Sequence, residues 1–173
     1  MHAEVVEFLS SIEVQTLGWV GAKVIEVGAA DWNGSARDYF DRWESWEGID
    51  LMPGPGVDHV GDAVALLAGM PADYFDYAVS TEVFEHAPEW RAIVAAMLRV
   101  LRPGGYLVAT CASPMRPPHS AVGAESLAPG EYYAGVSVVD MLQTVSVCGI
   151  PCTVIVAEDL PIPGDTRVLI RRE

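Results

Sequence analysis

Patterns typical of buried strands alternate with patterns typical of helices along most of the chain, and this alternation restricts the fold more than any other feature. Strands are expected at residues 23–27, 47–51, within 57–63, at 75–80 and at 106–110. Helices are expected within residues 1–20, at 34–43, at 88–101 with Pro88 first, and at 138–147 with Ser137 as the cap. Strands that alternate with helices form a mostly parallel sheet covered on both faces.

The last two strand patterns, at residues 152–157 and 167–172, are too close together for a helix to connect them. Their connection contains PIPGD, whose proline and glycine favour a turn. These strands must therefore form a hairpin, which makes the last strand antiparallel to the others. The sequence thus predicts an α/β fold with a mostly parallel seven-stranded sheet and an antiparallel last strand.

The composition fits one domain spanning residues 1–173, with 51% hydrophobic residues to build a core. Ten basic residues stand against 24 acidic ones, which gives a formal net charge of −14. A surface this negative repels phosphate backbones and anionic lipid. Nucleic acids and membranes are therefore disfavoured as partners.

Cysteine and histidine are sparse and lack the spacing of a disulfide framework or a metal site, so we expect no metal. The N-terminal sequence has acidic residues where a signal peptide has basic ones. No apolar run approaches the length of a membrane span. These features predict a soluble protein of the reducing cytoplasm.

The stretch VIEVGAADWNGSA, residues 24–36, has the outline of a strand that enters a glycine turn and then a helix. Gly28 allows a sharp turn and a close approach of a ligand to the backbone. Asn33 and Gly34 would open the helix, whose free N–H groups favour polar or anionic ligand atoms. An ordinary tight turn would use the same residues, so this stretch alone leaves both interpretations open.

Acidic residues at the ends of the following strands favour a nucleoside ligand. Asp50 could accept both hydroxyls of a ribose, and Asp62 could hold an adenine amino group, although solvated aspartates are common at such positions. Glu26 would repel a pyrophosphate but suits a ligand with a cationic amino-acid end. Nicotinamide and flavin enzymes also favour a tighter G-x-G-x-x-G that is absent here. These groups together favour S-adenosylmethionine.

The most specific stretch is FDYAVSTEVFEHAPEWRAIVAAMLRVLRPGGYLVAT, residues 75–110. Its E-x-x-E-H segment and its R-V-L-x-P-G-G turn resemble the class I S-adenosylmethionine-dependent methyltransferases, in a type 11-like branch. This resemblance implies a three-layer Rossmann-like methyltransferase fold and S-adenosylmethionine as cofactor, with S-adenosylhomocysteine as product and no metal. The predicted terminal hairpin agrees with this family's added antiparallel seventh strand.

The resemblance also implies the residues of the cofactor site. Those around the methionine moiety, the ribose, the adenine and the sulfonium would be Glu26, Gly28, Ala29, Ala30, Asp31, Asp50, Leu51, Asp62, Ala63, Ser80 and Thr81. Those at or near the catalytic mouth would be Glu82, Glu85 and His86, with Glu82 among the substrate contacts.

The glycine loop departs from the family pattern, because Ala30 and Trp32 replace glycines of the usual G-x-G-x-G and Glu26 replaces an aspartate. Asn33-Gly34-Ser35 resembles a variant of a wider loop. Trp32 could pack under the loop or cover the methionine end of the cofactor.

His86 is the candidate catalytic base, since imidazole is available as a base near neutral pH. The alternative is that His86 caps or packs against the helix beginning at Pro88.

The proline-rich stretch at residues 111–136 follows the fifth strand on the ligand side, where long irregular loops often bind substrate. It could also be a surface connection with its tyrosines packed on the core. The polar and aromatic groups it offers to a substrate are Arg116, His119, Glu131, Tyr132 and Tyr133.

The acceptor is expected to be a small molecule or a sugar-like group, methylated on oxygen or nitrogen. The D/N-P-P-Y motif of DNA amino-methyltransferases is absent after the fourth strand, and Pro151-Cys152 stands at a strand start, where it is structural. The competing hypothesis is a non-catalytic S-adenosylmethionine-binding subunit, supported by the altered glycine loop. A nucleotide-dependent oxidoreductase is disfavoured by Glu26 and the hairpin. The sequence does not indicate an oligomeric state.

Overall fold

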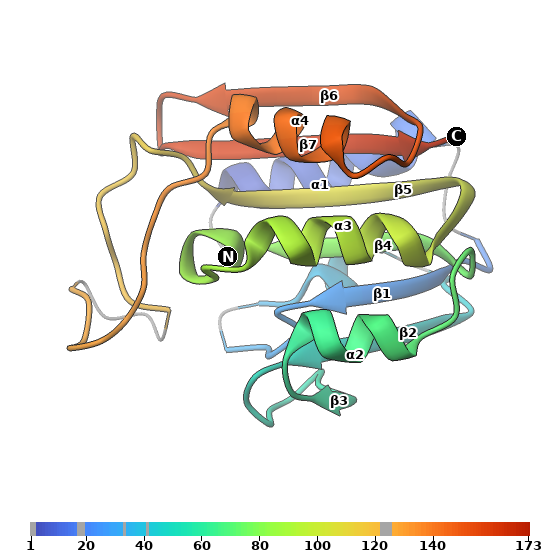
Figure 1. Cartoon of the computed structure of the whole chain (residues 1–173), viewed down its shortest axis with the longest axis horizontal. Helices are drawn as coiled ribbons and strands as arrows, with labels where there is room; N and C mark the ends of the chain where they lie inside the picture. Colours follow the sequence, from blue (N-terminus) through green and yellow to red (C-terminus); the bar gives the residue numbers. More distant parts are fainter. Residues whose placement is uncertain (1–2, 17–19, 33, 41, 122–125) are drawn as a thin grey trace.

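The computed structural model describes residues 3–16, 20–32, 34–40, 42–121 and 126–173. The strands in this part of the chain form one sheet in the order β3-β2-β1-β4-β5-β7-β6 (Figure 1). Strand β7 is antiparallel to β5 and β6, and the remaining pairs are parallel, as predicted. The strands are β1 Lys23–Val27, β2 Ser45–Asp50, β3 His59–Val60, β4 Phe75–Thr81, β5 Leu101–Ala112, β6 Cys152–Leu160 and β7 Asp165–Arg172.

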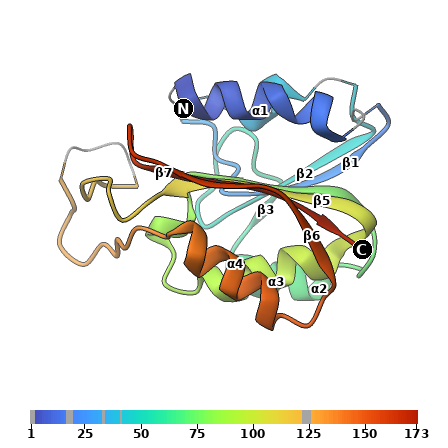
Figure 2. The same cartoon turned by 90° about the horizontal axis from the view of Figure 1, so that it is seen from above.

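Helices cover both faces of this sheet and complete three layers (Figure 2). Helix α1, Ala3–Thr16, and the short 3-10 helix η1, Ala36–Tyr39, lie on one face. Helices α2, Ala63–Gly69, α3, Trp90–Val100, and α4, Val138–Val147, lie on the other. A second 3-10 helix, η2, Phe84–His86, follows β4. The predicted α/β class is confirmed.

Helix α1 follows the predicted amphipathic pattern and lies within the predicted range, residues 1–20. Val5, Leu9 and Ile12 are buried against the sheet. Val20 lies in a turn before β1, and residues 17–19 lie outside the described residues. Among the described residues, no helix combines the length and the apolar character that a membrane crossing requires.

Helix α3 begins at Trp90, two residues later than predicted. Its cap position is therefore Glu89 and not a residue before Pro88. Its predicted apolar face is buried. Strand β5 starts directly at Leu101, so the PGG sequence lies within the strand, at a register shift opposite Phe75 and Tyr77. A Cβ on Gly105 would come within 2.9 Å of the carbonyl oxygen of Asp76, which explains the glycine.

Helix α2 was not predicted, because its sequence AVALLAG is short and almost uniformly apolar and so carries no helical period. The side chain of Asp62 caps it by accepting a hydrogen bond of 2.8 Å from the backbone N–H of Ala65.

The prediction of a helix at residues 34–43 is wrong for the described residues of this range, 34–40 and 42–43, where only η1 forms. Ser35 caps η1 by accepting a hydrogen bond of 3.1 Å from the N–H of Arg37. Asn33, the predicted cap, lies outside the described residues. The chain becomes extended at Phe40, whose ring packs edge-on against Trp46 at 5.3 Å and Tyr77 at 5.9 Å. Burial of this ring therefore overrides the helical pattern.

Gly48, in the middle of β2, lies close to the backbone at Gly56 and to Ala29, and a substitution there tests this close approach. A Cβ on Gly48 would lie 2.0 Å from the carbonyl oxygen of Gly56 and 2.7 Å from the Cβ of Ala29. Because the backbone would have to shift, we expect Gly48→Ala to lower the free energy of unfolding by about 3 kcal/mol. Urea denaturation would measure the loss.

The matched control is Gly69→Ala at the end of α2, where no heavy atom lies within 4 Å of the added Cβ. This variant is expected to be neutral or more stable by up to about 1 kcal/mol, because alanine favours the helix. Equal unfolding midpoints for the two variants would contradict the described approach of β2 to the segment at Gly56.

Candidate active site

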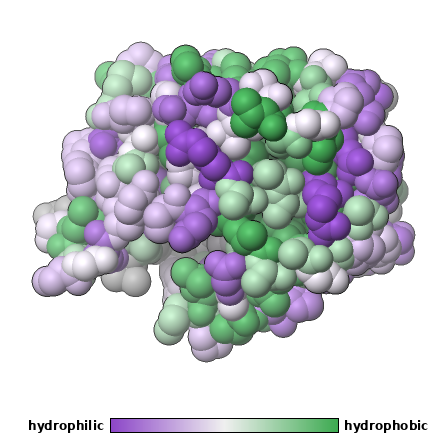
Figure 3. Space-filling view, in the orientation of Figure 1, coloured by the Kyte–Doolittle hydropathy of each residue, from purple (hydrophilic) through white to green (hydrophobic). Residues whose placement is uncertain are grey.

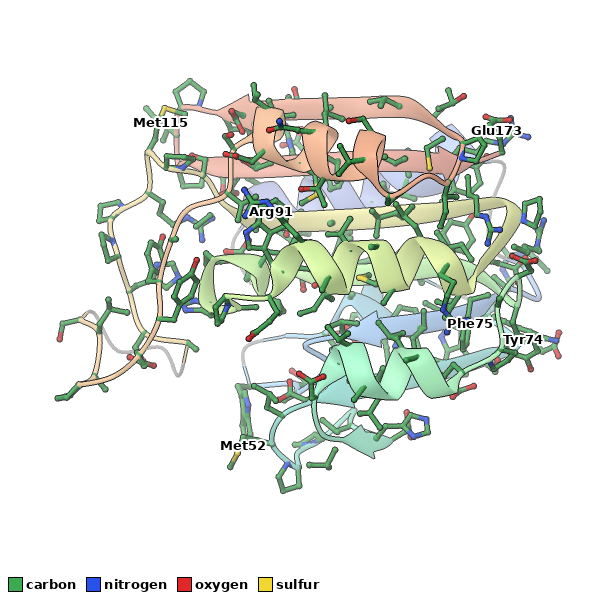
Figure 4. The ribbon with its side chains drawn as sticks, viewed as in Figure 1. Met52, Tyr74, Phe75, Arg91, Met115 and Glu173 are labelled. Carbon is green, nitrogen blue, oxygen red and sulfur yellow. The ribbon has the colours of Figure 1, made fainter. Side chains whose placement is uncertain are left out.

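A cavity of about 1090 Å³ opens at the carboxyl ends of β1, β2 and β4. The space-filling view is hollowed at the lower left, between the loop that follows β5 and the segments around β3 (Figure 3). Met52, after β2, and Met115, after β5, lie at this end of the molecule, whereas Tyr74 and Glu173 lie at the opposite end (Figure 4). The predicted site residues that line the cavity are Glu26, Gly28, Ala29, Ala30, Asp50, Leu51, Asp62, Ala63, Thr81, Glu82, His86, Arg116 and His119.

The loop after β1 turns at Gly28, which has a φ of +82°. A Cβ at this position would lie 2.0 Å from Cγ2 of Val83, so only glycine fits. The N–H groups of Gly28 and Ala29 both donate to the carbonyl of Ile49, at 2.9 and 3.0 Å. The glycine turn thus holds the loop against β2.

Trp32 is not packed under this loop. Its side chain is 63% exposed, lines the cavity, and lies against Gly54, where an added Cβ would be 3.1 Å from the indole. Asp31 does not line the cavity, and its Oδ1 accepts a hydrogen bond of 2.9 Å from the N–H of Gly34. The indole is therefore available to a ligand, whereas the Asp31 side chain shapes the loop.

The carboxylate of Asp50 joins the loops after β1 and β2. Its Oδ2 accepts from the N–H of Ala30 at 3.2 Å and its Oδ1 from the N–H of Met52 at 3.0 Å. Each oxygen has a second lone pair for a ligand hydroxyl. Asp62 also lines the cavity while it caps α2, a structural role that the sequence analysis did not predict.

Glu26 is 2% exposed and reaches the cavity from β1. Burial raises its pKa to about 7, although the indole N–H of Trp46, which donates at 2.9 Å, and the charge of Arg37 at 3.9 Å partly oppose this. The partners Trp46 and Arg37 carry no sequence signal that assigns them to a site. A cationic ligand would favour the ionised form of Glu26.

Ser80 does not line the cavity, contrary to the expectation. It is fully buried and pairs in register with Val27 and Ala109, and the alternation of side chains along β4 directs Thr81 and not Ser80 to the opening. Glu82, the next residue, has a φ of +59°, a conformation that costs energy for a non-glycine residue. Such backbone strain often occurs at functional sites.

The guanidinium of Arg116 lies among three carboxylates. It pairs closely with Glu82 and with Asp165, at the start of β7, and its Nη1 lies 3.9 Å from Oε1 of Glu85. Arg116 lines the cavity as predicted, but its charge is engaged by these acids. Asp165 was missed because only the fold brings β7 to this loop.

Glu85 is fully buried beneath the cavity. Burial raises its pKa to about 7, the charge of Glu82 adds to this, and nearby backbone N–H groups and Arg116 oppose it by less. Glu85 is therefore the least compensated acid of this group.

His86 lies at the cavity wall in a ring cluster with His119 and Tyr133, at centroid distances of 5.4 Å or less. Burial, followed by the charge of His119, lowers the pKa of His86. The cap position of α3 is occupied by Glu89, so His86 does not cap that helix. The geometry therefore agrees with a role at the cavity.

Neither Tyr132 nor Tyr133 lines the cavity. Tyr132 is exposed, whereas the hydroxyl of Tyr133 donates to the carbonyl of Arg116 at 3.4 Å. Glu131 accepts from Ser120 at 2.7 Å and from the N–H of Ala128 at 2.6 Å, which ties the two sides of the loop together. Direct substrate contact by the tyrosines is thus not supported in this conformation.

The sheet order, the glycine turn and the strand-end acids around one cavity are similar to those of the class I S-adenosylmethionine-dependent methyltransferases. Residues 29–109 of the chain match the family described as a methyltransferase domain. The terminal antiparallel strand agrees with this similarity.

A curated relative is consistent with this similarity. The chain is 31% identical over 111 residues to the ubiquinone biosynthesis O-methyltransferase of Idiomarina loihiensis. This match covers 56% of the chain and 45% of that protein. The chain therefore spans less than half the length of this curated relative.

Solved structures agree in fold. An S-adenosylmethionine-dependent methyltransferase from Mesorhizobium loti has a TM-score of 0.66 at 15% identity, over 96% of this chain and 100% of that one. The 1,6-didemethyltoxoflavin-N1-methyltransferase of Burkholderia thailandensis, with 1,6-didemethyltoxoflavin and S-adenosylhomocysteine bound, has a TM-score of 0.64 at 18% identity. The match covers 97% of this chain and 77% of that one.

The buried Glu26 generates a testable pH dependence. Its pKa is raised from 4.5 to about 7 in the folded state, so the unfolded chain ionises first and stability falls as pH rises between these values. Glu26→Gln removes this penalty while keeping an acceptor for Trp46. We expect the variant to be more stable than the wild type by about 2–3 kcal/mol at pH 8, with little difference at pH 4.

Urea denaturation at the two pH values measures this difference. Comparing variant with wild type cancels the contributions of the other acids. A stability gain of the same size at both pH values would contradict the raised pKa of Glu26.

Proposed function

We propose that this chain transfers the methyl group of S-adenosylmethionine to an oxygen or nitrogen of a small-molecule or sugar-like acceptor. The observation that carries the proposal is one cavity whose wall contains Asp50, Glu26 and His86, from the ends of β2, β1 and β4 in that spatial order. A nucleoside with a cationic amino-acid tail matches this sequence of groups.

In this proposal the cofactor lies across the three strand ends. Asp50 would accept from the ribose hydroxyls, and Leu51, Asp62 and Ala63 would border the adenine. Glu26 would face the ammonium group of the methionine moiety, which offsets the burial of its carboxylate. The sulfonium would then lie near Thr81, with its methyl group directed toward His86.

The transfer is an in-line displacement. A lone pair of the acceptor forms the new bond to the methyl carbon while the carbon–sulfur bond breaks and its electrons return to sulfur. The acceptor proton passes to a base, for which His86 is the candidate by position. The rest of the chain's contribution is to orient the acceptor and exclude water.

Two observations support a small acceptor. The names of similar proteins describe an O-methyltransferase of ubiquinone biosynthesis and a 1,6-didemethyltoxoflavin-N1-methyltransferase. The net charge of −14 disfavours nucleic acid. A cytoplasmic location stays a prediction from the sequence.

Labelled methyl transfer tests the proposal directly. The chain would be incubated with S-adenosylmethionine carrying a radioactive methyl group and with small-molecule fractions of the source cell. Acceptor-dependent label and equimolar S-adenosylhomocysteine are expected. Cofactor binding without transfer to any fraction would instead favour the non-catalytic subunit.

Asp50 provides a test of cofactor binding. We expect Asp50→Ala to weaken S-adenosylhomocysteine binding by about 1.5–3 kcal/mol, because the ribose hydroxyls lose a charged acceptor. Titration calorimetry would measure the affinity. Glu47→Ala, on the same strand but outside the cavity, is the control and should bind normally. An unchanged affinity in Asp50→Ala would remove this residue from the site.

His86 provides a test of catalysis. If it is the base, His86→Ala should lower kcat by about a hundredfold and leave the affinity for S-adenosylhomocysteine nearly unchanged, because its role begins in the transition state. His59→Ala, outside the cavity, is the matched control. Full turnover of His86→Ala across pH would assign the histidine a structural role.

A further inference from the structure

Three side chains with metal-binding atoms meet at the cavity wall. Glu85 and His86 come from η2, and His119 comes from the loop after β5. One ligand atom from each lies within 4.8 Å of the other two. This cluster escaped the sequence analysis, which searched for closely spaced cysteine and histidine, because residue 119 is distant in sequence from the other two.

Glu85 contributes a buried carboxylate that lacks a conventional partner. Its side chain is fully buried, and neither carboxylate oxygen accepts a well-formed hydrogen bond from the described residues. The guanidinium of Arg116 approaches only to 3.9 Å. A buried carboxylate in this situation is costly unless a cation compensates it.

The charges around Glu85 also favour a bound cation. Arg116 supplies one positive charge, whereas Glu82, Glu85 and Asp165 supply three negative charges around it when ionised. In this group of ion pairs the acids outnumber the guanidinium, which favours a cation beside the buried Glu85.

His119 is oriented as metal-binding histidines commonly are. Nδ1 of His119 lies 3.3 Å from the carbonyl oxygen of Pro117, a contact in which the ring donates and keeps Nε2 as its lone-pair nitrogen. Carbonyl groups often orient metal-bound imidazoles in this way. Nδ1 of His86 is buried without a hydrogen-bond partner among the described residues.

We propose that Glu85, His86 and His119 form a binding site for a divalent transition-metal ion, and that Zn²⁺ fits it best. Two imidazoles and one carboxylate suit zinc better than magnesium or calcium. Zinc binds such ligands at about 2.0–2.2 Å, which places tetrahedral ligand atoms about 3.4 Å apart. The three atoms lie within 4.8 Å of one another, so side-chain rotations must draw them together when the ion binds. The two histidines line the cavity, which leaves open coordination positions facing it.

An open position next to the expected sulfonium would hold an acceptor oxygen and lower its pKa. In the zinc-bound chain His86 is then a ligand and not the base, because its lone pair is occupied by the ion. This role of the ion rests on the proposed methyl transfer, whereas binding of the ion does not. The two ideas can therefore fail separately.

Zinc binding to the full chain tests the site. After treatment with a chelator, the chain would be titrated with Zn²⁺ in a calorimeter and with Co²⁺ under an absorption spectrometer. One equivalent is expected, together with a higher thermal midpoint and cobalt bands typical of nitrogen and oxygen ligands. Loss of a second-shell partner alone costs about 10–100-fold in affinity, so Glu85→Gln and His119→Ala should each weaken binding by about a hundredfold.

His59→Ala is the matched control, because His59 and Glu47 form a partly exposed pair 3.0 Å apart that could bind zinc adventitiously. Cys148→Ser tests binding by thiols. Neither control should change the affinity. Glu85→Gln keeps the side-chain volume. If this variant does not fold, the zinc affinity of His119→Ala, a change in the loop after β5, tests the site alone.

Absence of binding, or wild-type affinity in His119→Ala, would overturn the site, as would binding lost in either control. Zinc bound at this site by a chain that transfers no methyl group would overturn the proposed function only.

Discussion

Strand β1 lies between β2 and β4, and the carboxyl ends of these parallel strands meet at one edge of the sheet. The chain runs outward from β1 to β2 and β3 and then crosses back to β4, so the connections leave to opposite sides and a crevice opens between them. The glycine turn, Asp50 and the E-x-x-E-H segment all follow these strands. The strand order therefore brings together groups that are far apart in the sequence.

Elements with strong local signals could be predicted from the sequence. Helix α4 has the predicted bounds and the predicted Ser137 cap, because its period and cap are both local. The hairpin of β6 and β7 followed from the length of its connection. The segment at residues 34–43 could not be predicted in this way, because the packing of Phe40 against Trp46 and Tyr77 is a tertiary interaction.

The candidate site was predictable where it depends on strand ends. Glu26, Asp50 and His86 all reach the cavity. The position of Ser80 was wrong because a shift of one residue along a strand reverses the side-chain direction. The ion pair between Arg116 and Asp165 could not be predicted from the sequence, because only the terminal hairpin brings Asp165 to Arg116.

The brevity of η1 has an electrostatic consequence. A full α-helix after β1 would direct about half a positive charge from its N-terminus toward the cavity. Among the described residues, this connection contains a four-residue 3-10 turn instead, so the helix contribution to the local potential is small. The carboxylates of Asp50 and Asp62 at the cavity wall therefore have no opposing helix dipole from this connection. Their charge favours the approach of a cationic ligand over that of a phosphate.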